Sequence, residues 1–404
     1  MIPEVPFSRR EFVLAGAAAL GSLSSVGSAA AAVSRWNGNS ALPVPARSGI
    51  EHIVVVMMEN RSFDHLLGWL PGADGRQAGL SYVDNGGVSH STYRLAPDYQ
   101  GCGHPDPDHS YEGGRIQYDN GACDGFLRSG SNDVYAIGYY THRDLPFLGA
   151  AARDWTVCDR YFAALMGPTF PNRLYLHAAV TDRTVNTITA SSLPTIWDRL
   201  ASRGLSGRNY FVNIPTVLLW GAKYSSIARP YAHFLVDCKR GRLPHVAFVD
   251  PQFTGSDEGT AADDHPHADI RAGESFLART YTAVTTSPAW PRTVMIITFD
   301  EWGGFFDHVP PPIAPDVDPR YTLRGFRVPC IVISPFARRR HVAHGVYDHT
   351  SILRMIEWRW SLPPLSARDA QANNIAAVLD FKHRNLRAPR ITAPLVIGQA
   401  CAGA

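Results

Sequence analysis

The chain has 404 residues, of which 45% are hydrophobic and 18% are charged. That apolar fraction is typical of a folded globular protein and excludes a wholly disordered chain. The 38 Lys and Arg nearly balance the 36 Asp and Glu, so the large positive excess of nucleic-acid-binding proteins is missing and we exclude that class. The length allows one large domain or two small ones.

The first 32 residues have the pattern of a removable export signal. Arg9 and Arg10 precede an apolar run, and Ala29 to Ala32 offer small residues for cleavage. Paired arginines before a weakly hydrophobic segment are typical of the twin-arginine export machinery. The alternative is a membrane anchor, but Gly and Ser dilute the run before it reaches the ~20 apolar residues of a span. We expect a secreted, periplasmic or envelope-associated mature protein without a transmembrane anchor.

Short apolar runs alternate with helical patterns along the rest of the chain. The runs that predict buried strands are residues 53–58, 210–212, 246–249, 293–299 and 330–333, and helical patterns include residues 272–284 and 351–360. This alternation predicts an α/β fold with a mostly parallel central sheet flanked by helices. Residues 72–132 are rich in Gly, Asp, Tyr and His without a regular period, which indicates a loop-rich insertion beside the site.

Acidic and amide side chains follow three of the predicted strands directly. Glu59 and Asn60 follow the first strand, Asp250 follows another, and Asp300 and Glu301 follow residues 293–299. A single acid in such a place is commonly a helix cap or a turn residue. Two pairs are harder to explain in that way, because the carboxyl ends of parallel strands meet at one edge and the carboxylates there would repel each other. A divalent metal ion of unknown identity, held by hard oxygen ligands, would resolve the repulsion.

Thr169 stands just after a Gly-Pro turn and just ahead of a helical pattern. Two roles fit that position. A Thr there is an N-cap by default, because its hydroxyl can accept a hydrogen bond from the first helical turn. The same hydroxyl, at the positive end of a helix and next to a metal ion, could instead attack phosphorus as a nucleophile.

Histidines and cysteines add weaker signals. Several of the 16 histidines lie in acid-rich loops, and most are expected to be loop residues without a chemical role. The six cysteines form no zinc-binding spacing. In an exported protein we expect a disulfide between Cys102 and Cys123, which share one loop-rich segment. Cys330 lies inside an apolar run and is expected to be a buried hydrophobic residue.

Five segments in order resemble the signature blocks of the bacterial phosphoesterase family, which includes phospholipases C and an acid phosphatase branch. They are VVVMMENRSFDHLLG (54–68), MGPTFPNRLY (166–175), DDHPHADIRAGE (263–274), TFDEWGGFFDHVPPP (298–312) and YDHTSILRMIEW (347–358). The resemblance covers residues 50 to about 360. It implies an alkaline-phosphatase-like α/β fold and a covalent phospho-enzyme route.

The resemblance also implies roles for particular residues. Thr169 matches the hydroxyl nucleophile of the family. Three histidines match its phosphate-binding or proton-transferring positions, and four residues match its metal ligands. Glu301 departs from the Asp-Asp pair of the acid phosphatase branch and is closer to the phospholipase pattern. The histidines are His109, His265 and His349, and the predicted metal ligands are Glu59, Asn60, Asp300 and Glu301.

These observations predict a phosphoric ester hydrolase that acts on phosphodiesters such as phospholipid head groups. A phosphomonoesterase of the acid phosphatase type remains the alternative, and a catalytically dead periplasmic binding protein is the hypothesis from another class. No Cys-x-Pro-x-Arg motif is present at Thr169 to favour a sulfatase. The expected organisation is a signal peptide over residues 1–32, a single catalytic domain over 50–385 and a tail over 386–404. Residues 361–404, which follow the last block and hold four prolines, are not expected to form the β-rich C-terminal domain of longer members, so the substrate stays open.

Overall fold

The computed structural model describes residues 42–253 and 259–401, and the predicted export signal at Arg9 and Arg10 lies outside them. Its centre is an eight-stranded sheet with the strand order β13-β6-β12-β11-β1-β10-β8-β9. The strands are β1 (His52–Met58), β6 (Thr156–Cys158), β8 (Gly207–Phe211), β9 (Ala228–Pro230), β10 (Val246–Asp250), β11 (Thr293–Phe299), β12 (Cys330–Ile333) and β13 (His341–Ala343). Every neighbouring pair is parallel except the two that β12 makes with β11 and β6.

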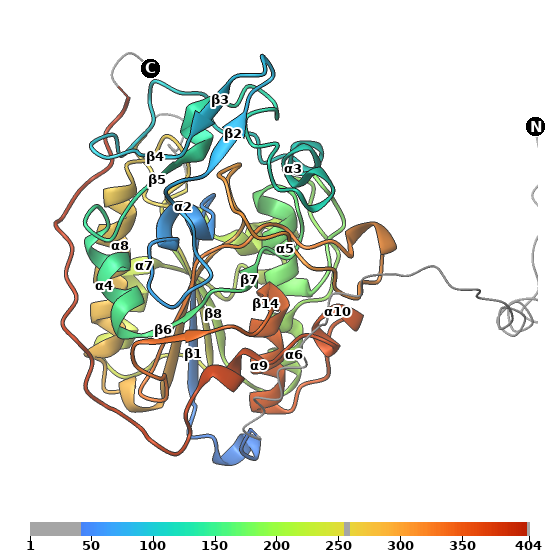
Figure 1. Ribbon diagram of the computed structural model, residues 1–404. Helices are drawn as coiled ribbons and strands as arrows, with labels where there is room; N and C mark the ends of the chain where they lie inside the picture. Colours follow the sequence, from blue (N-terminus) through green and yellow to red (C-terminus); the bar gives the residue numbers. More distant parts are fainter. Residues whose placement is uncertain (1–41, 254–258, 402–404) are drawn as a thin grey trace, which may run out of the picture. The chain divides into compact units, whose positions relative to one another are not determined.

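Helices cover both faces of this sheet (Figure 1). On one face lie α4 (Pro146–Asp154), α7 (Tyr231–Lys239) and α8 (Ile270–Thr285), and α8 contacts both of the others. On the other lie α5 (Thr169–Ala178), α6 (Ile196–Ser202), α9 (His349–Trp360) and α10 (Ala367–Ala370). The remaining described helices are α2 (Phe63–Leu67), α3 (Tyr111–Tyr118) and the 3-10 segments η1 (Pro45–Arg47), η2 (Asp119–Gly121), η3 (Val134–Ile137), η4 (Thr216–Tyr224), η5 (Trp290–Arg292), η6 (Pro319–Tyr321) and η7 (Ile375–Val378).

The predicted α/β class with a mostly parallel sheet is confirmed. The five predicted strands appear as β1, β8, β10, β11 and β12, and the two predicted helices appear as α8 and α9, with ends that shift by a few residues. β1 lies between β10 and β11 and is buried on both faces, which explains its unbroken apolar run. The short strands β6, β9 and β13 were not predicted, because three residues carry too little periodicity.

The loop-rich segment predicted over residues 72–132 carries little regular structure. It contains the hairpin β2 (Ser81–Val83) and β3 (Ser89–Ser91), the strand β4 (Tyr93–Arg94) and α3. β4 pairs with β5 (Gly138–Tyr139), and a further two-stranded sheet joins β7 (Tyr161–Phe162) to β14 (Tyr347–Asp348). His109, just before α3, brings this segment to the candidate site described below.

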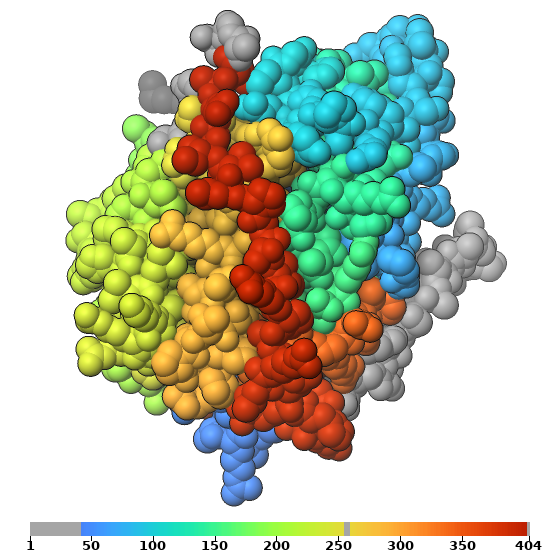
Figure 2. Space-filling view, turned by 90° about the vertical axis from the view of Figure 1, so that its left-hand side faces the viewer, coloured from blue at the N-terminus to red at the C-terminus, as the bar shows by residue number. Residues whose placement is uncertain are grey.

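The C-terminal strap, which we define as residues 386–401, runs along the domain between α8 and α4 (Figure 2). Tyr281 donates a hydrogen bond to the carbonyl of Pro389, and Ser275 donates to that of Pro394.

Cys401 at the end of the strap forms a disulfide with Cys102. The predicted Cys102–Cys123 pair is therefore wrong: Cys123 is a free, buried thiol, and the true partner is 299 residues away in sequence. Cys330 is buried in β12, as predicted.

The disulfide gives a testable expectation for stability. Cys401→Ser should lower the free energy of unfolding by about 2–4 kcal/mol, because the bond closes a very long loop in the unfolded chain. Thermal unfolding with and without reductant measures the effect. Cys123→Ser is the matched control and should respond to reductant as the wild type does. Equal melting temperatures for the wild type and Cys401→Ser under oxidising conditions would contradict the expectation.

In the described part of the chain, no helix combines the length and the apolar character required to cross a bilayer.

Candidate functional site

Four predicted ligands come together at the carboxyl edge of the sheet, although more than 200 residues separate the two pairs. The backbone N–H of Asn60 donates to Asp300 Oδ1 at 3.2 Å, and the N–H of Arg61 donates to the carbonyl of Glu301 at 3.1 Å. The strand ends adjoin because β1 and β11 pair in parallel along their whole length. Asn60 adopts a left-handed conformation with φ 56°, which turns the chain sharply after β1.

Gly303 lets the two loops approach each other this closely. It has φ +64°, and a Cβ at that position would lie 2.0 Å from the carbonyl oxygen of Asn60. Its N–H donates to Glu301 Oε2 at 2.6 Å and so orients that carboxylate. A side chain at position 303 would therefore push the Asn60 loop away from Glu301.

Arg173, which the sequence analysis did not single out, joins three acidic strand ends. Its Nε donates to Asp300 Oδ2 at 3.0 Å, and its other nitrogens lie 3.4 Å from Glu59 Oε1 and 3.8 Å from Asp250 Oδ1. All four side chains are buried. The repulsion among the carboxylates is thus relieved in part by a guanidinium group that belongs to the protein. Its signal in the sequence was a lone arginine within the block that contains Thr169.

Positive charge is still scarce at this edge of the sheet. Burial raises the pKa of Glu59 and of Asp300 above the ordinary range, although Arg173 opposes this in both cases. Burial also raises the pKa of Glu301 well above its usual value, with His109 pulling in the opposite direction. A further cation near these groups would favour their ionised forms.

Thr169 is the first residue of α5, one turn before Arg173, so the two side chains lie on the same side of the helix. The N-cap of α5 is Pro168, and no side chain caps this end, so the hydroxyl of Thr169 does not act as the predicted cap. Asn172 holds the preceding turn by donating to the carbonyls of Leu165 and Gly167. Arg173 therefore ties the helix that starts at Thr169 to the acidic strand ends.

A cavity of about 570 Å³ opens beside this turn. Its walls come from the segment before α3, from Pro168 and from residues 184–186. His109 is one of the lining residues, and its Nε2 lies 3.2 Å from Asn60 Nδ2. The cavity thus extends between Pro168, at the start of α5, and His109, which lies next to Asn60.

His109 and His265 lie next to each other, with ring centroids 5.7 Å apart. Together with Asp106 they offer ligand atoms that all lie within 4.8 Å of one another. Burial opposes protonation of His109, but the carboxylates of Glu301 and Asp106 outweigh it and raise its pKa to about 9. Burial lowers the pKa of His265. Asp106 was missed by the sequence analysis, although it lies only three residues before His109.

His349 has a different environment from the other two histidines. Its Nε2 donates to the carbonyl of Asp300 at 2.6 Å, and its Nδ1 lies 3.1 Å from the hydroxyl of Tyr161. Burial lowers its pKa to about 4, so the ring is neutral at ordinary pH. Both ring nitrogens thus bond to protein groups, an arrangement that supports the Asp300 backbone. A role in proton transfer stays a prediction for His349.

Two buried oxygens bear on whether these residues fit a metal ion. Within the described residues, Asn60 Oδ1 and Glu301 Oε1 have no hydrogen-bond partner. Leaving a buried acceptor without a partner is costly, and both atoms are of the type that a hard divalent cation prefers. The chemistry of these donors therefore fits such an ion. Asn60 and Glu301 would supply oxygen ligands, and Asp106, His109 and His265 are the neighbouring group whose ligand atoms lie within 4.8 Å of one another.

Residues 50–363 match the family described as Phosphoesterase family, so the match spans most of the chain. The chain belongs to the phosphoesterase family. The predicted enzyme class, a phosphoric ester hydrolase, is confirmed by this membership. Phospholipase C A of Mycobacterium tuberculosis is 30% identical to this phosphoesterase over 98% of this chain and 89% of that protein. Non-specific phospholipase C1 of Arabidopsis thaliana is 32% identical over 83% of this chain and 72% of that protein.

Solved structures match this phosphoesterase at much lower sequence identity. Murine ectonucleotide pyrophosphatase/phosphodiesterase 5 matches 82% of this chain and 100% of that one, with 8% identity and a TM-score of 0.45. A protein in the alkaline phosphatase superfamily from Vibrio parahaemolyticus matches 80% of this chain and 69% of that one, with 9% identity and a TM-score of 0.40. The α/β architecture of this chain is established by its own strands and helices.

Proposed function

We propose that this chain is an exported, metal-assisted phospholipase C that cleaves phosphodiesters of phospholipids, with Thr169 as the nucleophile. The observation that carries the proposal is the site at the carboxyl edge. There the hydroxyl of Thr169 makes no capping hydrogen bond, lies one turn from Arg173 and stands beside an open cavity. Similarity to phospholipases C of a bacterium and a plant supports a phospholipid as the substrate.

The reaction would proceed in two displacements at phosphorus. Thr169 Oγ1 would lose its proton to His265 and attack, forming an O–P bond while the bond from phosphorus to the diacylglycerol oxygen breaks, and that oxygen would take a proton from His109. Water would then lose a proton to His109 and attack the ester on Thr169. This step would release the phosphorylated head group, while the Thr169 oxygen takes its proton back from His265. A divalent ion would supply Lewis-acid stabilisation of the charged oxygens. Arg173 would keep the start of α5 in a fixed position relative to the strand ends during both steps.

The start of α5 offers fewer free amides than its position suggests. Phe170 N–H donates to Asn186 Oδ1 at 2.8 Å, and Pro171 has no N–H. At this helix terminus, a phosphoryl oxygen would therefore be stabilised mainly by a hydrogen bond from the N–H of Thr169 itself. Export by the twin-arginine machinery, read from Arg9 and Arg10, is part of the same proposal.

One assay separates the proposal from its alternatives. The purified protein should hydrolyse p-nitrophenylphosphorylcholine with a kcat/KM at least about tenfold above that for p-nitrophenyl phosphate, because the cavity can accommodate a second ester group. Dialysis against a chelator should reduce turnover by about 10²-fold or more, and added divalent metal should restore it. A preference for the monoester would favour the acid phosphatase alternative. Absence of turnover on both substrates, with metal supplied, would favour a binding protein.

A further inference from the structure

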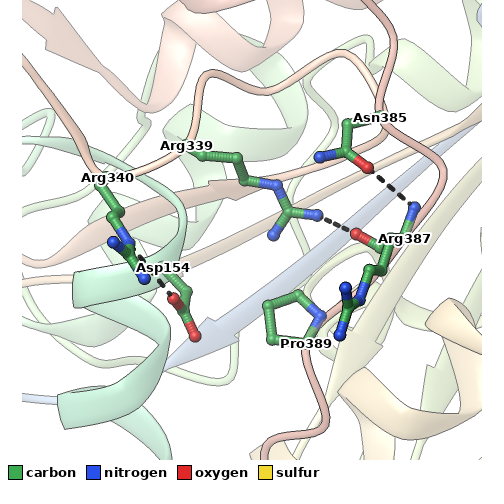
Figure 3. Close-up of a pocket in the computed structure, with 6 residues that line it drawn as sticks. All are labelled: Asp154, Arg339, Arg340, Asn385, Arg387 and Pro389. Atoms are coloured by element: carbon green, nitrogen blue, oxygen red, sulfur yellow. Dashed lines mark hydrogen bonds and ion pairs between the residues drawn. The ribbon is translucent and has the colours of Figure 1, made fainter.

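A second cavity lies far from the candidate site and is lined mainly by arginines. It has a volume of about 290 Å³, and its walls are Asp154, Arg339, Arg340, Asn385, Arg387 and Pro389. Figure 3 shows these side chains gathered from three segments: the end of α4, the turn between β12 and β13, and the chain around the start of the strap. A pocket of this size suits a small ligand.

The two segments that carry these arginines concentrate positive charge. Residues 338–340 and 380–390 together hold seven Lys and Arg but only one acid, Asp380, whereas the whole chain has a net charge of +2. The segments pack against each other, since Asp380 N–H donates to the carbonyl of Phe336 and Asn385 N–H donates to that of Pro335. Asp380 also pairs with His383 at 2.9 Å. The surface around the pocket is therefore strongly cationic.

The charge inside the pocket is poorly neutralised. The guanidinium carbon of Arg339 lies over the ring of Trp155, 3.3 Å from its centroid, and the guanidinium group donates to the carbonyl of Arg387. Its Nε is buried without a partner, and no carboxylate of the described residues pairs with it or with Arg387. The single acid of the pocket, Asp154, lies 3.9 Å from the exposed Arg340. Partly buried guanidinium groups without counter-ions favour an added anion.

The pocket lies at the opposite end of the sheet from the candidate site. β12 runs antiparallel to β11, and its last residue, Ile333, pairs with Met295 near the start of β11. The turn that follows β12 therefore lies at the amino end of the parallel strands. Asp300 and Glu301 follow the carboxyl end of β11. A ligand in the pocket would thus not compete with substrate, and substitutions there should leave the chemistry alone.

We propose that this pocket is a separate binding site for a phosphate-type oxyanion. The planar guanidinium of Arg339, fixed by Trp155, would bind two oxygens of the anion side by side, with Arg340 and Arg387 closing over the others. The anion can come from free phosphate or from the head group of an anionic lipid. In the second case the cationic surface around the pocket would hold the protein on a membrane.

The test compares the wild type with Arg340→Ala/Arg387→Ala, which removes two exposed side chains and keeps the Arg339–Trp155 stack. Arg240→Ala/Arg279→Ala is the matched control, because it removes two exposed arginines outside the pocket. In equilibrium dialysis with inorganic phosphate, the wild type and the control should bind one more phosphate per chain than the pocket variant. Equal phosphate binding by all three proteins, together with equal vesicle binding, would overturn the proposal.

Vesicle co-sedimentation then identifies the source of the anion. With vesicles containing phosphatidylglycerol, loss of two pocket arginines should weaken binding by about thirtyfold if the lipid head group is the ligand. Vesicles of pure phosphatidylcholine should bind all three proteins alike. If the pocket variant binds one phosphate fewer in dialysis but binds vesicles as the wild type does, the ligand of the site is free phosphate. Hydrolysis of p-nitrophenylphosphorylcholine should stay at the wild-type rate in the pocket variant, and a large loss would overturn a separate site.

Discussion

Replacing Thr169 by alanine is expected to lower kcat on the order of 10⁴-fold or more while leaving the fold nearly intact. The hydroxyl makes no capping bond at the start of α5, so its loss removes little stability. A nucleophile, by contrast, cannot be replaced by a methyl group. The measurement is kcat with p-nitrophenylphosphorylcholine, beside a thermal unfolding curve for each protein.

Thr169→Ser is the matched control for this prediction. It keeps a hydroxyl in place, so substantial activity should survive in the serine variant and not in the alanine variant. Acid quench during turnover should also trap a phosphorylated Thr169. If the alanine variant keeps more than about a tenth of the wild-type kcat, less than ~1.4 kcal/mol of the barrier was lost, and a water molecule must make the attack.

Arg173→Met is expected to reduce both stability and turnover. The guanidinium contacts Glu59, Asp250 and Asp300, and removing one partner from such a buried ionic cluster typically costs about 3–5 kcal/mol. Because Arg173 also ties α5 to the strand ends, a small displacement of Thr169 should lower kcat by about 10²-fold. Arg173→Lys should recover part of the stability, since it keeps the charge but lacks the planar fork.

A second buried arginine separates the loss of stability from the effect on the site. Arg327 pairs with Asp64 and Asp307 and makes no described contact with the predicted metal ligands. Arg327→Met should lower the melting temperature by a similar amount, while the protein that remains folded keeps a kcat nearer the wild-type value. If Arg173→Met and Arg327→Met show the same kcat, Arg173 has no special role at the site.

Local patterns were enough to predict the central strands and the acidic strand ends. β1 and β11 are buried on both faces, and such strands leave an unbroken apolar run that is visible without any partner. Glu59 and Asp300 follow those runs directly, and parallel strands must end at the same edge. Their convergence therefore followed from strand direction alone. The short strand β6 could not be found, because it is defined by its neighbours β12 and β13 rather than by its own residues.

The sequence by itself determined the α/β class, the family resemblance and the acidic edge, because each depends on residues close together in the chain. Only the tertiary structure decided that Arg173 contacts three carboxylates and that Cys401 rather than Cys123 pairs with Cys102. It also decided that Arg339 donates to the carbonyl of Arg387 in a cationic pocket. Each of these contacts joins residues that are far apart in the chain. Ion pairs and disulfides depend on distances of a few ångströms, and those distances are set by how helices and loops pack on the sheet.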